Sequence, residues 1–259
     1  MTAIDGRGTS TAPIAPQVKP VTPQRTPRKT APGRRPGFLG SSSGRKAVMA
    51  VTGAVLVIYL VLHMAGNLKI FSGAESYNAY AGFLRTMGEP AVPYRTVLTV
   101  IEVVLAVSVV LHMWAAITLA RRAGKARPVK YAARRKSQAN GYVAHIMRWG
   151  GVTIALFVVW HLLDLTFGTV NPAGAGGTPY ERMVQGFAPE RWWVTLFYAV
   201  SVVMVGLHLR HGLWSAFQTL GLAGGRNYRP LRATAAVISA VLVLGFLVVP
   251  FSIMIGVVK

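Results

Sequence analysis

Residues 47–66 read AVMAVTGAVLVIYLVLHMAG, a run that holds no Lys, Arg, Asp or Glu and a single histidine, His63. A helix rises about 1.5 Å per residue, so this run can cross the roughly 30 Å hydrocarbon core of a bilayer. Four later runs are also apolar and long enough to cross, and the second of them is extended on its N-terminal side by Tyr142–Trp149. These runs are Thr96–Ala120, Gly150–Phe167, Trp192–Phe217 and Ala233–Val258. The sequence therefore predicts five membrane-spanning segments.

The composition indicates an all-α, polytopic membrane protein. Of the 259 residues, 53% are hydrophobic and 14% are charged, and the mean hydropathy of +0.44 excludes an ordinary soluble domain. Backbone groups in lipid must be paired internally, and a barrel would need alternating strands of about ten residues, so the apolar runs are predicted to be helices. The absence of cysteine excludes disulfides, cysteine-bound zinc and iron–sulfur clusters ligated by this chain.

Residues 1–46 differ in character from the rest of the chain. They are rich in Pro, Thr, Ser, Gly and Arg, hold nine basic residues against the single acid Asp5, and show no apolar period. Such a segment buries too little apolar surface to offset its chain entropy. We therefore expect a disordered basic cytoplasmic tail, followed by a five-helix transmembrane domain over 47–259. An Arg-rich, acid-poor tail is also typical of an organelle transit peptide, which is the alternative interpretation.

Basic residues are distributed unevenly between the two ends of the predicted helices. The tail holds nine, residues 121–136 hold eight and residues 226–232 hold three, all on one side, against six on the other side. By the positive-inside rule, this bias places the N-terminus in the cytoplasm and the C-terminus outside. The net charge of +21 thus follows the membrane topology, which disfavours a nucleic-acid binder.

Four of the six histidines fall inside predicted spans, where a histidine is costly and indicates function. His63 and His161 come late in helices that run outward. His112 and His208 come late in helices that run inward. The helical rise then puts the first pair level in the outer leaflet and the second pair level in the inner leaflet. Two opposed imidazoles at one depth on different helices are what bis-histidine ligation of haem iron requires. Small residues that would leave room for a flat macrocycle are Gly66, Gly150, Gly151 and Gly206.

Other roles for these histidines stay open from the residues alone. Each could be a packed, hydrogen-bonded side chain or a member of a proton relay. Glu102 lies about two turns into its span and could carry protons or merely hydrogen-bond inside the bundle. A catalytic zinc site is disfavoured, because zinc takes three protein ligands clustered at one point.

Several short motifs follow one another along the chain. They are His63-Met-Ala-Gly-Asn-Leu68, Ser76-Tyr-Asn-Ala-Tyr80, Phe83-Leu-Arg85, Leu111-His112, Trp160-His161, and His208 followed by Gly212-Leu-Trp-Ser215. In their order and spacing, residues 46–259 resemble the five-helix, two-haem cytochrome b membrane anchor of succinate:menaquinone oxidoreductases (complex II) and of the related fumarate reductases. The resemblance implies that the first four helices form a haem-binding bundle.

The resemblance also implies two b-type haems as cofactors. His63 and His161 would ligate the outer haem, and His112 and His208 the inner haem. Family members carry asparagine where this chain has His211, so the resemblance places the haem ligand at His208. The alternative is that His211 is the ligand and His208 lies near a propionate. Arginines near helix ends can instead anchor at lipid head groups, which is an equal alternative for Arg210. The residues placed for contact with the propionates of the inner haem are His145, Arg148, His211 and Arg210.

A quinone site is implied near the outer haem, where the first loop meets the ends of the first and third helices. Side chains there offer hydrogen bonds to a quinone carbonyl and a carboxylate for proton handling. Each of them also has an ordinary loop or cap role open to it. The candidates are Asn67, Lys69, Tyr77, Asn78, Tyr80, Arg85 and Asp164.

By this resemblance, the chain is expected to be the membrane-anchor subunit of a succinate dehydrogenase in the plasma membrane of a bacterium. It would dock a flavoprotein and an iron–sulfur subunit, which carry out the succinate chemistry, and pass electrons through the two haems to menaquinone. An anchor of a fumarate reductase or of another dehydrogenase would use the same haems, and the sequence does not separate these roles. A haem-free, histidine-lined proton relay or transporter is the alternative from a different class.

Overall fold

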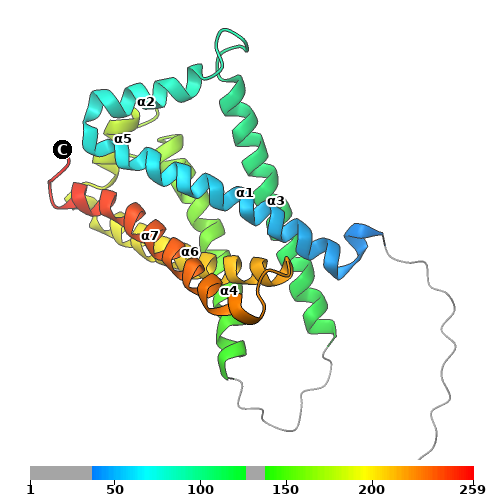
Figure 1. Cartoon of the computed structure of the whole chain (residues 1–259). Coiled ribbons are helices and arrows are strands. Elements are labelled where there is room, and N and C mark those ends of the chain that lie inside the picture. The colour runs from blue at the N-terminus through cyan, green and yellow to red at the C-terminus, as the bar shows by residue number, and fades with distance from the viewer. Residues whose placement is uncertain (1–36, 127–137) are drawn as a thin grey trace, which may run out of the picture. The chain divides into compact units, whose positions relative to one another are not determined.

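Five long helices dominate the computed structural model, which describes residues 37–126 and 138–259, with side chains from residue 146 onward in the second range. Each belongs to a segment long and apolar enough to cross a membrane, and the described residues contain no strand. The prediction of an all-α, polytopic protein with five spans is confirmed. The helices are α1 (Ser42–Leu68), α3 (Thr96–Lys125), α4 (Gln138–His161), α6 (Trp192–Thr219) and α7 (Tyr228–Met254) (Figure 1).

The helices extend beyond the apolar runs that predicted them. α1 begins at Ser42 rather than at Ala47, and the Ser41 hydroxyl accepts a hydrogen bond of 2.9 Å from the Gly44 amide. Hydropathy marks only the part of a helix that lies in hydrocarbon, whereas the helix continues through polar residues at the membrane surface until a cap ends it. The remainder of the predicted tail, residues 1–36, lies outside the described part of the chain.

The C-terminal end of α4 changes its helical geometry. α4 starts at Gln138 and includes Tyr142–Trp149, as the sequence predicts. At His161 the α-helix passes into a π-helix, Leu162–Thr166. Such π-turns are rare and occur frequently at functional sites. This one follows directly after a candidate ligand and contains Asp164.

Two short helices lie in the connections at one end of the bundle. α2 (Ala74–Thr86) follows α1 through the 3-10 turn Lys69–Ser72, and α5 (Pro179–Gly186) lies between α4 and α6 in the chain. α5 opens with a capping box, in which Thr178 and Glu181 each accept a hydrogen bond from the other's backbone amide. These hydrogen bonds hold the pKa of the Glu181 carboxyl below its usual value. The remaining short helices are 3-10 turns at Phe38–Gly40, Pro189–Arg191 and Gly225–Asn227.

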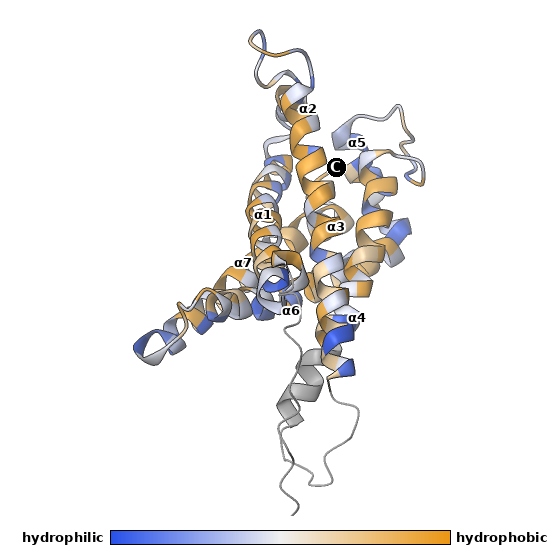
Figure 2. Ribbon diagram, turned by 90° about the vertical axis from the view of Figure 1, so that its right-hand side faces the viewer, coloured by the Kyte–Doolittle hydropathy of each residue, from blue (hydrophilic) through white to orange (hydrophobic). Residues whose placement is uncertain are grey.

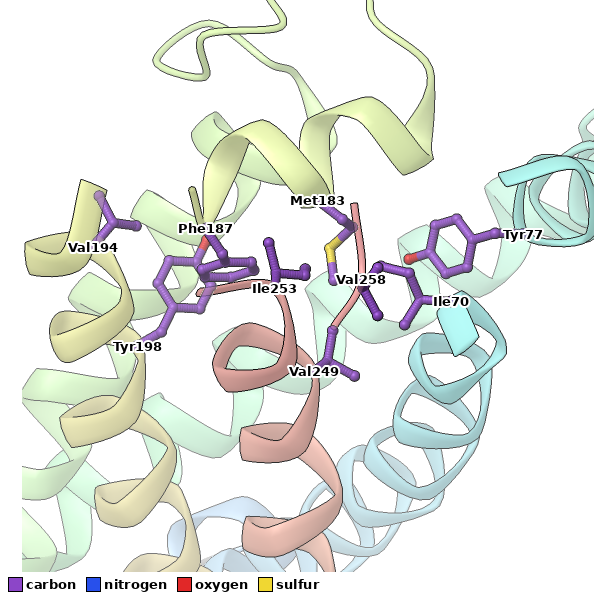
Figure 3. Close-up of a cluster of buried hydrophobic side chains, with 9 residues drawn as sticks. All are labelled: Ile70, Tyr77, Met183, Phe187, Val194, Tyr198, Val249, Ile253 and Val258. Atoms are coloured by element: carbon purple, nitrogen blue, oxygen red, sulfur yellow. The ribbon is translucent and has the colours of Figure 1, made fainter. Parts of the chain in front are cut away.

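A buried apolar cluster joins α2 and α5 to the ends of α1, α6 and α7 (Figure 3). Within it, Phe187 and Tyr198 meet edge to face with ring centroids 4.8 Å apart. α2 and α5 are further linked by the Tyr180 amide, which donates a hydrogen bond of 3.1 Å to the Asn78 side chain. Burial of these side chains fixes the first loop against the helix ends. The cluster comprises Ile70, Tyr77, Met183, Phe187, Val194, Tyr198, Val249, Ile253 and Val258.

Among the described helices, α6 contacts α4, α7 and α1, and α1 also contacts α3 and α7. Where α6 meets α7, the Ser239 hydroxyl donates to the Gly206 carbonyl, and a Cβ on Gly206 would overlap the Val243 side chain. Gly206 therefore serves the close approach of α7, and the expectation that it leaves room for a macrocycle is wrong. Side chains that face away from the bundle, such as Val110 and Leu244, are apolar and exposed, as lipid-facing residues are. Hydrophobic residues run along much of the ribbon of the long helices (Figure 2).

Candidate functional site

His63 of α1 and His161 of α4 face each other across the bundle. Their ring centroids are 5.7 Å apart, and the ring planes meet at 88°. Tyr59, one turn before His63, stacks on that imidazole at 5.2 Å, with its hydroxyl 3.4 Å from His63 Nδ1. The structure thus brings together the two histidines predicted to lie at one level in the outer half of the membrane.

Aromatic rings enclose His161. The ring centroids of Phe157 and Tyr198 lie 5.7 Å and 6.0 Å from the imidazole centroid. The Nδ1 atom of His161 is buried, and among the described residues it has no hydrogen-bond partner. Since buried polar atoms normally have a partner, this nitrogen is open to a ligand.

His112 of α3 and His208 of α6 form the second pair, with ring centroids 6.3 Å apart and an interplanar angle of 60°. His112 Nδ1 lies 3.1 Å from the Met49 carbonyl oxygen and 3.2 Å from the Thr52 hydroxyl. Because a carbonyl only accepts, Nδ1 carries the proton, and the lone pair on Nε2 is free for a metal. His208 Nδ1 is buried with no partner in the part of the chain that the structure describes.

Residues of α1 hold the His112 imidazole in a fixed position. Thr52 donates its own hydroxyl proton to the Val48 carbonyl at 2.7 Å, so an oxygen lone pair remains to accept from the imidazole. At Gly53, an added Cβ would lie 3.3 Å from His112 Cε1, a tight contact that the glycine avoids. Together with the Met49 carbonyl, these two residues hold the ring close to α1.

Each pair has about the ring separation that two imidazoles would have if both bound the same iron. A metal–imidazole bond is about 2 Å long and the ring centre lies about 1.1 Å further on, so two opposed ligands place their centroids roughly 6 Å apart. The observed separations are 5.7 Å and 6.3 Å. No three His, Cys, Asp or Glu side chains of the described residues gather at one point as a metal site would need. Two protein ligands per metal suit an iron whose other ligands come from a porphyrin, so the residues present fit haem.

A buried carboxylate adjoins the first pair. Asp164 lies in the π-turn after His161 and is fully buried. Its Oδ1 accepts hydrogen bonds from Arg191 at 3.3 Å and from the Asn171 amide at 3.2 Å, and its Oδ2 accepts from the Tyr198 hydroxyl at 3.2 Å. A buried charge requires such partners. The network ties the π-turn to α6, and through Tyr198 it reaches the His161 ring.

A cavity of about 160 Å³ opens beside His63. Three of the predicted quinone candidates, Asn67, Tyr77 and Tyr80, contribute to its wall. Burial, with a smaller contribution from Tyr80, raises the pKa of Tyr77 to about 12, so its hydroxyl remains a hydrogen-bond donor at neutral pH. The other lining residues are Gly66, Ala81, Leu84 and Pro179.

The remaining quinone candidates do not line this cavity. The Lys69 ammonium group lies 5.6 Å from the centre of the Tyr80 ring, at the border of the cavity. Asn78 and Arg85 are engaged in hydrogen bonds with backbone groups. Both carboxylate oxygens of Asp164 are occupied by its buried network, which favours a positioning role over direct contact with a ligand.

The candidates for propionate contacts are dispersed. His211 is partly buried, one turn after His208 on the same face of α6. Arg148 is exposed, and the side chain of His145 lies outside the described residues. Arg210 comes two residues after His208, about 200° around the helix, and lines a groove between α6 and α7. Arg210 thus belongs to the opposite face of α6 from the histidine pair.

Glu102, whose role the sequence left open, has a partner. Arg95, which precedes α3, donates to its carboxylate at 3.3 Å, and both side chains are about half exposed. A carboxylate paired at the surface in this way needs no further partner inside the bundle.

The partners of the π-turn carboxylate are the functional residues that sequence reasoning missed. An acid within an apolar run does indicate that partners exist. Spacing along the chain does not identify them, because Asn171, Arg191 and Tyr198 lie 7, 27 and 34 residues away from it.

The fold and the site define an all-helical, polytopic membrane protein that brings two pairs of histidines together between its helices. Residues 124–249 match the family model of the succinate dehydrogenase/fumarate reductase transmembrane subunit. The match supports this family over about half of the chain. It includes His161 and His208, one member of each pair, while their partners His63 and His112 precede it. The curated proteins and the solved structures gave no match.

Proposed function

We propose that the chain is the cytochrome b membrane-anchor subunit of a succinate dehydrogenase. The observation that carries this proposal is the meeting of His63 with His161, and of His112 with His208, on four different helices. The family match over residues 124–249 supports it independently of the geometry. Oxidation of succinate belongs to a flavoprotein and an iron–sulfur subunit that dock on this chain.

In this proposal the four histidines hold two b-type haems, which supply one-electron transfer when bound. The chain's own contribution is to orient the imidazoles. The Met49 carbonyl fixes the proton of His112 on Nδ1, which leaves Nε2 as the ligating nitrogen. Packing between Phe157 and Tyr198 restricts the rotation of the His161 ring.

The cavity beside His63 is the proposed site for menaquinone. The Tyr77 hydroxyl and the Asn67 amide can donate hydrogen bonds to a quinone carbonyl, and Tyr80 offers a ring face for stacking. The volume of about 160 Å³ is below the roughly 300 Å³ of common ligand pockets. The cavity therefore suits a flat head group, with the isoprenoid tail left in the lipid.

We place the N-terminus in the cytoplasm and the C-terminus outside, in the plasma membrane of a bacterium. The support is the excess of basic residues at the ends of the helices on one side. The flavoprotein and the iron–sulfur subunit would dock on this side, nearer to the pair His112 and His208. Of the described basic residues on this side, Arg121, Arg122 and Lys125 lie in the last turns of α3. Arg226 lies just before α7, and Arg229 and Arg232 lie in its first turns.

Succinate-driven reduction of a menaquinone analogue by the purified complex tests this function. We expect turnover that is lost in His63→Ala and His208→Ala. The control Thr153→Val alters a partly exposed threonine on α4 and is expected to turn over normally. Faster fumarate reduction than succinate oxidation would assign the chain to a fumarate reductase. A folded complex with neither activity and no haem would favour the histidine-lined proton relay.

A further inference from the structure

A groove of about 360 Å³ runs between α6 and α7, which lie side by side (Figure 1). Arg210 is the one charged residue that lines it. The other lining residues are apolar or small, except for Ser239, whose hydroxyl is already bonded to the Gly206 carbonyl. Much of the groove wall is exposed on the outside of the bundle, with Leu207 and Leu244 at 38% and 68% exposure.

A second arginine lies on the face of α7 that lines the groove. Arg232 precedes the lining residue Ala236 by four positions and Ala240 by eight, so the three share one helical face. On α6, Arg210 follows the lining residue Leu207 by three positions, so these two residues also share one helical face. Both arginines are exposed, which gives each wall of the groove a cation.

An aromatic contact shows that the two cations lie at the same end of the groove. Trp214 of α6 and Tyr228 of α7 meet edge to face, with ring centroids 4.8 Å apart and planes at 82°. Trp214 comes one turn after Arg210, and Tyr228 comes one turn before Arg232. The contact therefore brings the two arginine-bearing turns next to each other.

Nearby acids do not neutralise these arginines. No Asp or Glu follows Glu190 in the sequence. The ion pairs of the described residues, Arg95 with Glu102 and Arg191 with Asp164, involve neither arginine of the groove. A guanidinium group is well suited to a phosphate, which it can bind through two parallel hydrogen bonds.

We propose that this groove binds one anionic phospholipid, with an acyl chain along its apolar floor and the head-group phosphate between Arg210 and Arg232. Both the position in a membrane-spanning segment and the uncompensated charge favour this occupant. A second copy of the chain is a poorer occupant, because a two-fold contact through the groove would bring the arginines of both copies together. The site lies on the opposite face of α6 from His208, so it does not depend on a bound haem.

Phosphatidylglycerol is the probe for the test, added to the full-length chain purified in detergent with the subunits that accompany it. Native mass spectrometry would count the lipid molecules that remain bound, with phosphatidylcholine as the comparison. We expect one retained phosphatidylglycerol, and an affinity about tenfold lower in Arg210→Gln and in Arg232→Gln. Arg226→Gln removes the same charge from the connecting turn, at a residue that does not line the groove, and should bind normally.

A second variant tests the groove without altering its charge. Ala240→Trp fills the space between the helices and is expected to lower phosphatidylglycerol binding as well, with folding checked by far-UV circular dichroism. Three results would overturn the proposal: equal retention of the two lipids, unchanged binding in both arginine variants, or a dimer through this face that persists when phosphatidylglycerol is present.

Discussion

Arg191 donates two hydrogen bonds of 3.3 Å to one carboxylate oxygen of Asp164, which lies 27 residues earlier in the chain. The Asp164 side chain is fully buried and that of Arg191 is 13% exposed. The pair formed by Arg95 and Glu102 has the same separation of 3.3 Å, yet its side chains are about half exposed. The two pairs therefore allow a comparison between a buried carboxylate, which also accepts from Asn171 and Tyr198, and a half-exposed carboxylate that accepts a single bond from Arg95.

Arg191→Met is expected to lower the free energy of unfolding by about 3 kcal/mol, because Asp164 is then buried without its cation. Arg95→Met breaks the exposed pair and should cost less than about 1 kcal/mol. Adding Asp164→Asn to Arg191→Met should restore part of the loss. Unfolding in detergent followed by circular dichroism measures all three, and equal losses in the two arginine variants would contradict the assigned burial.

Thr52→Val removes one of the two acceptors beside His112 Nδ1. We expect the haem held by His112 and His208 to bind about tenfold more weakly, because groups that orient a metal-ligating histidine contribute to metal affinity. Thr153→Val is the control: it also loses a hydroxyl bonded to a carbonyl four residues earlier, but no histidine contact of that hydroxyl is seen. The measurement is the haem content per chain after incubation with a protein that takes up released haem. Loss of the haem assigned to His63 and His161 instead would contradict the assignment of His112 and His208 to one haem.

Tyr77→Phe is expected to lower kcat/KM for the quinone about tenfold, the effect of one lost hydrogen bond in the proposed site. Since burial raises the pKa of Tyr77 to about 12, the hydroxyl stays protonated and the loss should be constant between about pH 6 and about pH 9. Tyr94→Phe, at an exposed tyrosine, serves as the control. A difference between wild type and variant that disappears toward pH 9 would show that Tyr77 ionises there.

Alanine substitutions at two glycines of α6 should have opposite effects. A Cβ at Gly206 would overlap Val243, so Gly206→Ala is expected to cost about 1 kcal/mol or more. A Cβ at Gly212 meets nothing within 4 Å, so Gly212→Ala should stabilise the helix by about 0.5 kcal/mol. Thermal unfolding in detergent compares them, and stabilisation by both would be inconsistent with the close approach of α7.

Much of the fold could be predicted from the sequence because the bilayer imposes simple rules. Apolar length identifies the five spans, and the helical rise places His63 level with His161 and His112 level with His208. The structure brings these same pairs together. The depth of a residue in a membrane helix follows from its position in the run and the helical rise. Contacts between residues at the same depth can therefore be predicted from the sequence.

Direction around a helix and long-range partners were harder to predict. Depth along the helix groups Arg210 with the inner histidines, yet its side chain lies on the opposite face of α6. The sequence predicts room for a cofactor at Gly206, but in the structure this glycine faces Val243 of α7, and the sequence does not predict where α7 packs. The partners of Asp164 come together only through the π-turn and the folding of the connection around α5, which hydropathy does not encode.

A reduced-minus-oxidised optical spectrum of the purified chain, with haem quantified per chain, tests the paired histidines most directly. We predict two b-type haems. His63→Ala and His161→Ala should each lose one and the same haem, and His112→Ala and His208→Ala should each lose the other. A folded chain that was supplied with haem and shows none, or four variants that all lose the same haem, would contradict the assignment of the two pairs to two haems.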